Sequence, residues 1–375
     1  MASRAAAPPP SDRHAERDPV LPTASLLPQL PDDVSIQCIA RVPRFFHARL
    51  AYVSRSWRCL LRSPALFAAR LSCGAAFPFL CVDIRTTSAR SSWFLLDREP
   101  RNPRPLLPLP PPLLPTAGSA CATLGPLLFV IGGSLDGATP TTAVQVFDVR
   151  FRRWHLGPRM GSAREFAAAG AVGGRIYVVG GCLPSSEPWA EVLDPDSGRW
   201  APMPSPLDVR EKWMHGSVVL DGKLLAVADH GGLLFDPAVG TWGSVSTALD
   251  MGWKGRAAVV DGIIYSYDFL GNIKGFDPVM DEWREVEGVS EELPRFLSGA
   301  ALAELGGHLC VLWEGKRAKR GKEMEIMCAA IKVSREAAAG AASSGKLRGK
   351  IVWTDAIALA FPKGSSVSHC LAVEV

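Results

Sequence analysis

The chain has 375 residues, of which 47% are hydrophobic and 21% charged, and its 41 basic and 37 acidic residues leave a formal net charge of +4. So small a charge, spread along the chain, argues against a nucleic-acid partner, which generally requires a basic face on the scale of a domain. The 35 glycines and 31 prolines are too many for a helical bundle, so turns must be frequent and elements short. No run reaches the roughly 18 apolar residues of a spanning helix, and the N-terminus lacks the apolar segment of a secretory signal. We therefore expect a soluble protein of the cytoplasm or nucleus, without a membrane partner.

The nine cysteines are scattered singly and never occur as Cys-x-x-Cys. This spacing argues against a zinc ribbon and against a disulfide scaffold, and favours reduced thiols that are mostly buried. We expect no metal site.

The first seventy residues divide into two segments that differ in composition and apolar pattern. Residues 1–27 combine Ala, Pro and mixed charge without an apolar period, which predicts a disordered tail. From Leu30 the acidic pair Asp32-Asp33 predicts the start of a helix that Pro43 ends, and two further short helical stretches follow as far as Phe67. Three helices of about ten residues bury little surface by themselves, so we expect this unit to need a partner.

The pieces of this stretch resemble an F-box. They are Leu30-Pro31-Asp32-Asp33 at the start, Val53-Ser54-Arg55-Ser56-Trp57-Arg58 in the middle and Ser63-Pro64 before Leu66-Phe67 at the end. The resemblance implies a small three-helix F-box over residues 28–70 that binds a Skp-type adaptor. Carried over residue by residue, the implied adaptor contacts are Leu30, Pro31, Ile39, Val53 and Trp57. The alternative is that these residues form an ordinary helical core packed on the rest of the chain.

After Cys73 short apolar runs alternate with Gly and Pro, a pattern typical of an all-β domain, and one sequence unit recurs four times. In each copy an apolar residue and an Asp are followed, six residues after the Asp, by a Trp. The copies are Phe147-Asp148 with Trp154, Leu193-Asp194 with Trp200, Phe235-Asp236 with Trp242, and Phe276-Asp277 with Trp283. A period in the low to middle forties is that of a propeller blade with four strands.

Between these copies lie predicted hairpins. The pairs Gly173-Gly174, Asp221-Gly222, Asp261-Gly262 and Gly306-Gly307 each separate two apolar runs. Such pairs supply the positive φ angles that two-residue hairpin turns require. Strand, hairpin, strand, Phe-Asp strand and Trp strand together resemble the kelch repeat, and the Trp-Asp dipeptide of WD40 repeats is absent.

Residues 73–375 therefore predict an all-β kelch propeller, and at about 45–50 residues a blade the length gives six four-stranded blades. We expect the last strand, His369 to Val375, to pair with Phe79–Ile84 and close the ring, because closure removes an exposed sheet edge. The segments 100–115, 316–322 and 337–350 are interpreted as surface loops. The basic run 316–322 is also a candidate nuclear import signal.

Propellers also host enzymes, so catalysis needs a separate test. A copper-radical oxidase would need Tyr and His ligands with a Tyr–Cys pair, which the four tyrosines and seven scattered histidines do not favour. Sialidase-type catalysis has no motif behind it, although sequence alone leaves it open. Phosphate-binding, zincin and nucleophile-elbow motifs are absent. We expect a protein that is not an enzyme and has no cofactor.

Binding residues in a propeller are expected in the loops of one face. Just before predicted first strands the chain places the basic and aromatic residues Lys212, Trp213, Trp253 and Arg295, which are types enriched at interface hot spots. They are our candidate substrate contacts. The alternative is that such residues only hold the loops in place.

An F-box followed by a kelch propeller resembles the plant F-box/kelch-repeat proteins of the Skp-interacting-partner type. The resemblance implies the substrate-recognition subunit of a Skp–cullin–F-box E3 ubiquitin ligase, which binds the adaptor through the F-box and an unknown protein substrate through the propeller. The alternative is a kelch scaffold or small-molecule sensor whose F-box serves self-turnover or adaptor sequestration.

Overall fold

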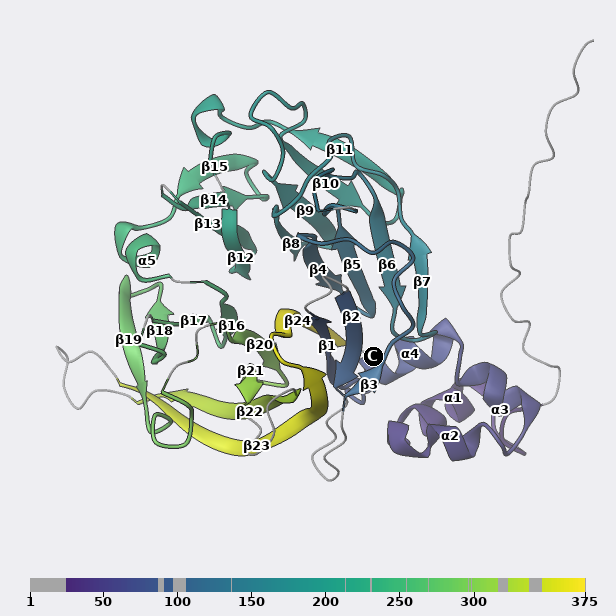
Figure 1. Cartoon of the computed structure of the whole chain (residues 1–375). Coiled ribbons are helices and arrows are strands. Elements are labelled where there is room, and N and C mark those ends of the chain that lie inside the picture. Colours follow the sequence, from purple (N-terminus) through teal and green to yellow (C-terminus); the bar gives the residue numbers. More distant parts are fainter. Residues whose placement is uncertain are drawn as a thin grey trace, which may run out of the picture. The chain divides into compact units, whose positions relative to one another are not determined.

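A computed structural model of the chain (Figure 1) describes residues 25–86, 91–96, 106–135, 137–212, 214–229, 231–253, 255–268, 270–295, 297, 299–315, 323–336 and 346–374. The chain forms two compact units, Met1–Ala76 and Phe77–Val375, here called the helical unit and the β unit. Most of the predicted tail and the basic run 316–322 lie outside the described residues.

The helical unit consists of short helices. They are α1 (Asp32–Ala40), the 3-10 helix η1 (Arg44–Phe46), α2 (His47–Leu50), α3 (Arg55–Leu60) and α4 (Pro64–Ser72). The division is finer than the predicted three helices because two serines restart the helix. The Ser54 hydroxyl accepts the Trp57 amide at 3.0 Å, and the Ser63 hydroxyl accepts the Leu66 amide at 3.3 Å. Side-chain caps of this kind satisfy amides that have no partner within the helix.

A small core holds the helical unit together. It contains the buried residues Leu26, Ile39, Ala40, Leu60, Leu66 and Ala69. The indole N–H of Trp57 donates to the Leu26 carbonyl at 2.7 Å, which attaches the segment before α1 to α3. Leu26 precedes the start of the predicted F-box at residue 28, so the folded core begins before that boundary.

The β unit contains four sheets of four strands. Their spatial orders are β24-β1-β2-β3, β4-β5-β6-β7, β11-β10-β9-β8 and β12-β13-β14-β15. The strands are β1 (Pro78–Arg85), β2 (Ser91–Leu96), β3 (Leu107–Pro108), β4 (Ala120–Leu124), β5 (Leu127–Ile131), β6 (Val144–Asp148), β7 (Arg153–Leu156), β8 (Ala168–Val172), β9 (Arg175–Val179), β10 (Ala190–Asp194), β11 (Arg199–Met203), β12 (Met214–Leu220), β13 (Lys223–Ala228), β14 (Leu233–Asp236), β15 (Thr241–Ser244) and β24 (Ser366–Glu374).

A fifth sheet has eight strands in the order β16-β17-β18-β19-β23-β22-β21-β20. They are β16 (Ala258–Val260), β17 (Ile263–Tyr267), β18 (Ile273–Asp277), β19 (Glu282–Glu287), β20 (Ala301–Leu305), β21 (His308–Gly315), β22 (Glu323–Arg335) and β23 (Leu347–Pro362). Two antiparallel groups of four strands meet where β19 and β23 pair in parallel, over only two residue pairs. The connections before β12 and β16 carry the 3-10 helix η2 (Leu207–Val209) and the helix α5 (Thr247–Gly252).

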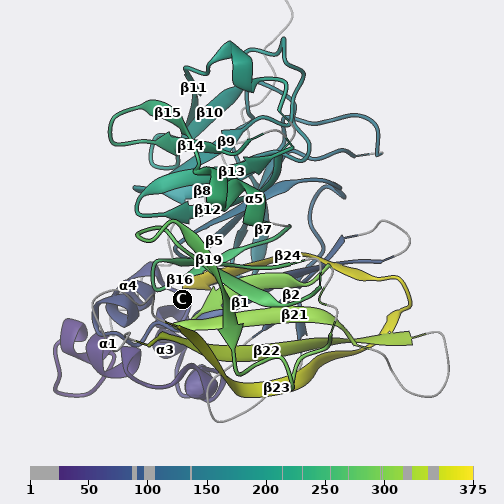
Figure 2. The same ribbon diagram turned by 90° about the vertical axis from the view of Figure 1, so that its left-hand side faces the viewer.

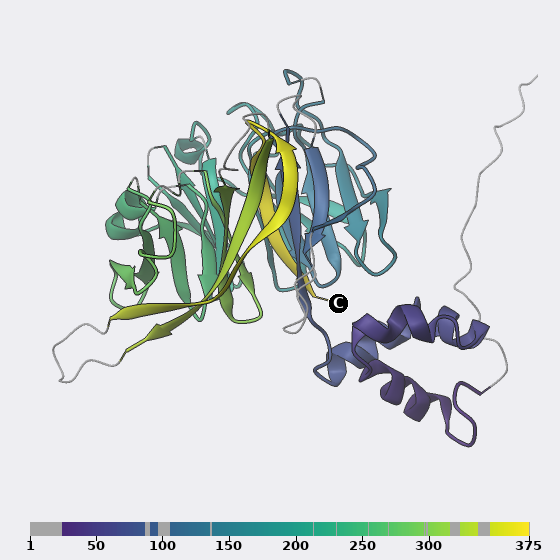
Figure 3. The same cartoon turned by 60° about the horizontal axis from the view of Figure 1, so that its bottom comes forward.

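The sheets of the β unit surround a common axis, with the first strand of each group nearest to it (Figure 1). Figure 2 shows the same sheets side-on, and in Figure 3 the long yellow-green strands β22 and β23 run together beyond the shorter ones. The last strand pairs with the first, for example Val82 with Cys370, so the predicted pairing of the C-terminal strand is confirmed.

The repeated Asp and Trp residues make equivalent hydrogen bonds in all four copies. In all four copies the Asp carboxylate accepts the backbone amide two residues later, as from Asp194 to Asp196 at 3.0 Å. The four Trp indoles donate to a backbone carbonyl in the connection that leads into their own sheet, as from Trp200 to Pro158 at 2.9 Å. Neighbouring sheets also meet where the Trp242 ring lies tilted against the Trp189 ring, with ring centroids 5.9 Å apart.

Two segments that the sequence assigned to surface loops are partly strands. Leu107-Pro108 forms β3 and pairs with β2, and Pro108 is tolerated because it lies on an edge strand. Residues 347–350 open β23 and pair with the end of β22. In β23 the apolar residue faces a core: Leu347 is buried among Val286, Ile331 and their neighbours.

Candidate functional site

The predicted adaptor residues fall into two groups in the helical unit. Leu30 and Val53 are exposed over 41% and 62% of their surface, and Pro31, the N-cap residue of α1, is also exposed. In contrast, Ile39 is buried in the small core, and Trp57 is half-buried with its indole N–H bonded to Leu26. The exposed residues Leu30, Pro31 and Val53 are available for contact with a partner, whereas Ile39 and Trp57 pack inside the helical unit.

Sequence reasoning passed over two further exposed apolar residues in this unit. Val34 lies one turn after Pro31 on α1 and is 41% exposed, and Tyr52 precedes Val53 and is 84% exposed. The spacing of Val34 from Pro31 on a helix was the signal that could have identified it. A large aromatic left in water on a unit with so small a core is a feature of interaction surfaces.

The predicted substrate residues lie in the connections between sheets. The Lys212 ammonium donates to the Gly231 carbonyl at 3.1 Å, and Arg295 is exposed before β20. Trp253 is only 3% exposed, packs against Leu249, and donates its indole N–H to the Gly255 carbonyl. Trp213 lies outside the described residues. Each of these connections leads from the last strand of one four-stranded group to the first of the next, so Lys212, Trp253 and Arg295 share one face of the β unit.

One arginine of this face, Arg164, makes contacts within the chain and is not exposed. Arg164 is fully buried and donates to the carbonyls of Gly180, Pro188 and Trp189 and to the Glu191 carboxylate, which it meets at 2.9 Å. Its role is to hold the loops around β9 and β10, as the interpretation of such residues as loop supports predicts.

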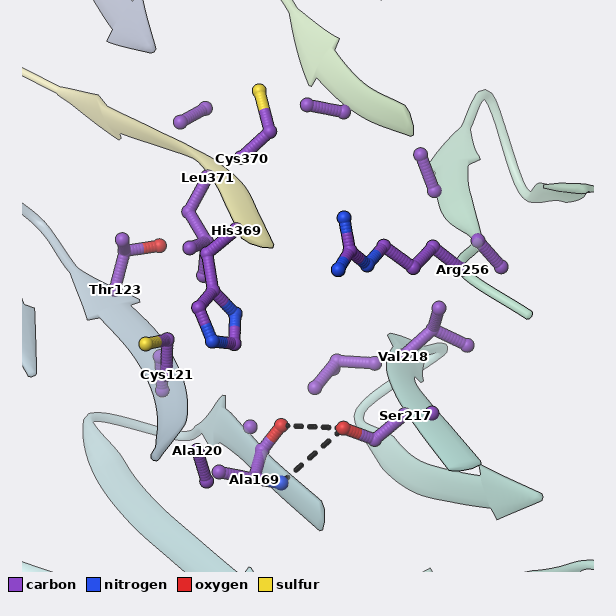
Figure 4. A pocket seen from close by; sticks show the side chains of 18 of the residues that line it. Ala120, Cys121, Thr123, Ala169, Ser217, Val218, Arg256, His369, Cys370 and Leu371 are labelled. Atoms are coloured by element: carbon purple, nitrogen blue, oxygen red, sulfur yellow. Dashed lines mark hydrogen bonds between the residues drawn. The ribbon is translucent and has the colours of Figure 1, made fainter. Parts of the chain in front are cut away.

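A cavity of about 870 Å³ follows the axis of the β unit. It is lined by the first strands β4, β8, β12, β16 and β20, by the last strand β24, and by parts of β1. Figure 4 shows Arg256 and His369 pointing into it from opposite sides. Small residues such as Ala120, Gly170 and Gly216 line much of its wall, and this leaves the space open.

The basic and the acidic side chains that line this cavity lie at its opposite ends. Arg85 at the end of β1 lies beside Ser366 at the start of β24, whereas Pro78 and Glu374 pair at the opposite end of the same two strands. Arg256 precedes β16, so it belongs to the Arg85 end. Glu304, near the end of β20, belongs to the Glu374 end. One end of the cavity is therefore basic and the other acidic.

The groups around the two arginines are adjusted by burial and by charge. Burial, together with Arg256 and Arg85, lowers the pKa of His369 to about 3, so its imidazole is neutral and stacks on Trp93 at 6.2 Å between ring centroids. Burial raises the pKa of Asp83 to about 6, against the opposing effect of the hydrogen bond from the Ser91 hydroxyl. Burial also lowers the pKa of Arg256.

Among the residues that the structure describes, no helix is both long and apolar enough to cross a membrane.

Comparison with known proteins gives matches over both units. Residues 27–68 match the F-box domain, and residues 93–358 match the kelch-repeats domain of the FKB95 type. Two Arabidopsis thaliana proteins named F-box/kelch-repeat proteins are 31% and 29% identical to this chain, over 93% and 96% of it and 94% of each relative. A third from the same plant is 30% identical over 94% of this chain and 95% of its own length.

Proposed function

Because this chain belongs to the F-box/kelch-repeat protein family, we propose that it is the substrate-recognition subunit of a Skp–cullin–F-box E3 ubiquitin ligase. The helical unit binds the Skp-type adaptor, the β unit binds a target protein, and the ubiquitin transfer itself is performed by other subunits. The chain then contributes no chemical step. Its contribution is proximity, because it raises the concentration of target lysines near the loaded conjugating enzyme.

The observation that carries the adaptor half of the proposal is the exposed apolar surface of the helical unit, formed by Leu30, Pro31, Val34, Tyr52 and Val53. None of them belongs to the core of six buried residues, so their exposed apolar surface is available to be buried by a partner. Burying one Leu or Val side chain contributes about 1.5–3 kcal/mol.

The β unit supports a propeller with six blades. The four four-stranded sheets each supply one blade, and the eight-stranded sheet supplies two, since only two residue pairs join its halves. Because β24 pairs with β1, strands from both ends of the β unit belong to the same sheet, and this pairing closes the ring. A rigid ring of this kind presents its connecting loops on one face, which is where we propose that the target protein binds.

Within that face the proposed roles differ by exposure. Arg295 and Lys212 can reach a bound target directly, whereas the buried Trp253 positions the loop before β16. We include Trp213 in the proposed contact set on sequence grounds. The proposed compartment is the cytoplasm or the nucleus, where cullin–RING ligases operate.

The adaptor half is tested by co-purification of the full chain with a Skp-type adaptor and a cullin. Changing Leu30 and Pro31 together to Ala removes two exposed contacts, and we expect the dissociation constant for the adaptor to rise roughly 30-fold or more, as for truncation of interface hot spots. Val53→Ala is expected to act in the same direction.

Val279→Ala is the matched control for Val53→Ala, because Val279 is an equally apolar and even more exposed side chain on a turn of the β unit. It should leave adaptor binding unchanged. The proposal is refuted if the unsubstituted chain binds no adaptor, or if the control weakens binding as much as Val53→Ala does.

The target half has a separate test. Lys212, Trp213 and Arg295 are changed to Ala in a chain that still binds the adaptor, and proteins captured by each form in cells with inhibited proteasomes are compared. Loss of a specific captured protein supports the assignment, and an unchanged set of captured proteins contradicts it.

A further inference from the structure

The axial cavity holds two arginines that its wall does not neutralise. Arg85 forms no ion pair with a described carboxylate, and its Nε is buried without an acceptor in the part of the chain that the structure describes. Arg256 donates one N–H to the Val367 carbonyl of β24. Figure 4 shows the Arg256 guanidinium directed into the cavity. A buried donor without an acceptor costs stability, and among the arginines of the described residues that have such a nitrogen only Arg85 lines this cavity.

The surroundings supply one carboxylate for two arginines. The only carboxylate that acts on both arginines among the described residues is Asp83, which is buried and already accepts the Ser91 hydroxyl. His369, on the same end of the cavity, is held neutral and stacked on Trp93. Glu304 and Glu374 lie at the opposite end. The Arg85 end is thus a site of positive potential inside a low-dielectric wall.

The size of the space indicates what can enter. At about 870 Å³ the cavity is within the range of roughly 300–1,000 Å³ that binding pockets for small molecules occupy. Alanine and glycine on the first strands keep it open at the axis, and Phe166 and Met214 provide apolar surface near the basic end. A guanidinium fork matches the planar oxygens of a carboxylate or the oxygens of a phosphate.

From this geometry we propose that the axial cavity is a binding site for a small organic anion, whose carboxylate or phosphate group is held between Arg85 and Arg256. The apolar body of the anion lies along the wall formed by β4, β8 and β12. Its charged group points away from Glu304 and Glu374, because these carboxylates would repel it. The site is independent of adaptor binding, which uses the helical unit alone.

The experiment uses the full chain and two probes, inorganic phosphate and succinate, each titrated at constant ionic strength set with sodium chloride. Binding is measured by isothermal titration calorimetry and by the shift of the unfolding temperature, because a ligand of the folded state raises that temperature. We expect saturable binding of one equivalent of at least one probe. The two probes distinguish a phosphate site from a carboxylate site.

Arg256→Gln and Arg85→Gln should each weaken this binding at least tenfold, since each removes one charged fork. Arg199→Gln is the matched control, because Arg199 is an exposed arginine on β11 and does not line the cavity. It should bind the probes as the unsubstituted chain does.

Arg85→Gln keeps the test decisive if Arg256→Gln fails to fold, because it breaks no ion pair with a described carboxylate, whereas Arg256 bonds the Val367 carbonyl. Adaptor co-purification by Arg85→Gln should be unchanged, so a failure here is distinct from a failure of the ligase proposal. The inference is overturned if neither probe binds saturably. It is equally overturned if the folded arginine variants bind within twofold of the control.

Discussion

The buried pair of Arg164 and Glu191 permits a quantitative prediction about the β unit. Arg164 is fully buried and Glu191 is 2% exposed. Besides Arg164, the Glu191 carboxylate accepts the backbone amides of Gly161 at 2.7 Å and Ser162 at 3.3 Å. The Arg164 side chain thereby connects the segment before β8 with the loop between β9 and β10. We predict that Arg164→Ala destabilises the unit far more than the loss of a surface arginine.

The magnitude follows from what the substitution leaves behind. Removing one partner of a buried ion pair costs about 3–5 kcal/mol, because the remaining charge stays buried without compensation. In addition, the carbonyls of Gly180, Pro188 and Trp189 lose a donor. Each buried acceptor left without a donor costs about 1–3 kcal/mol, although relaxation and water recover part of this. We therefore expect a loss of about 3–5 kcal/mol in the free energy of unfolding, at the upper end of this range if the loop does not relax.

The assay is urea denaturation of the full chain, followed by the fluorescence of the blade tryptophans. Lys274→Ala is the control, because Lys274 forms a partly exposed ion pair with Asp268 at 3.0 Å and such pairs contribute less than about 1 kcal/mol. The double variant Arg164→Met with Glu191→Met should recover the part of the loss that comes from the unpaired Glu191 carboxylate, since both charges are then absent. Equal effects of Arg164→Ala and Lys274→Ala would refute the reasoning.

Two further predictions concern single groups of the β unit. Trp200→Phe removes the N–H that bonds Pro158 and should lower the free energy of unfolding by about 1–2 kcal/mol, measured by the same urea titration. The folded-state pKa of Asp83 is raised from 3.8 to about 6, so the stability that its protonated form contributes is present at low pH and is lost as the pH rises through about 6. Asp83→Asn should therefore stabilise the chain at pH 7.5, by at most about 3 kcal/mol, and have little effect at pH 4; a gain that is equal at both values contradicts this. His369, whose folded-state pKa is lowered to about 3, has the opposite dependence, and the stability of its neutral form is lost as the pH falls below about 6.5.

The periodic part of the structure was predictable because it is encoded by local chemistry. Asp221-Gly222 and Asp261-Gly262 have positive φ at both residues, as the hairpin prediction requires. The repeated Asp residues close turns with their own backbone, and the repeated Trp residues bond the preceding connection, so equal spacing in sequence reflects equal geometry. Predictions of this kind need no knowledge of long-range contacts.

What the sequence did not reveal depends on residues far apart in the chain. Residues 347–350 contain charge and glycine and were interpreted as loop, yet they become strand because β22 offers a partner edge and Leu347 fills the core of the neighbouring sheet. Likewise, Trp253 was proposed as a contact from its residue type, and only the packing against Leu249 shows that its ring is buried. Arg85 and Arg256 carry no periodic signal, and only the closed ring brings them to one cavity.

Arg164 and Arg85 show how recognition residues differ from supporting residues on this scaffold. Both are arginines of the β unit whose buried Nε has no acceptor among the described residues. The terminal nitrogens of Arg164, however, donate to three carbonyls, the Cys182 sulfur and the Glu191 carboxylate, whereas Arg85 lines the axial cavity without an ion pair to a described carboxylate. An arginine whose charge is paired within the chain stabilises the fold, whereas one on a cavity wall without an ion pair is available to an anionic ligand. The two substitutions should therefore have different effects: Arg164→Ala lowers the free energy of unfolding without a specific effect on anion binding, and Arg85→Gln weakens anion binding at least tenfold while stability is kept or raised.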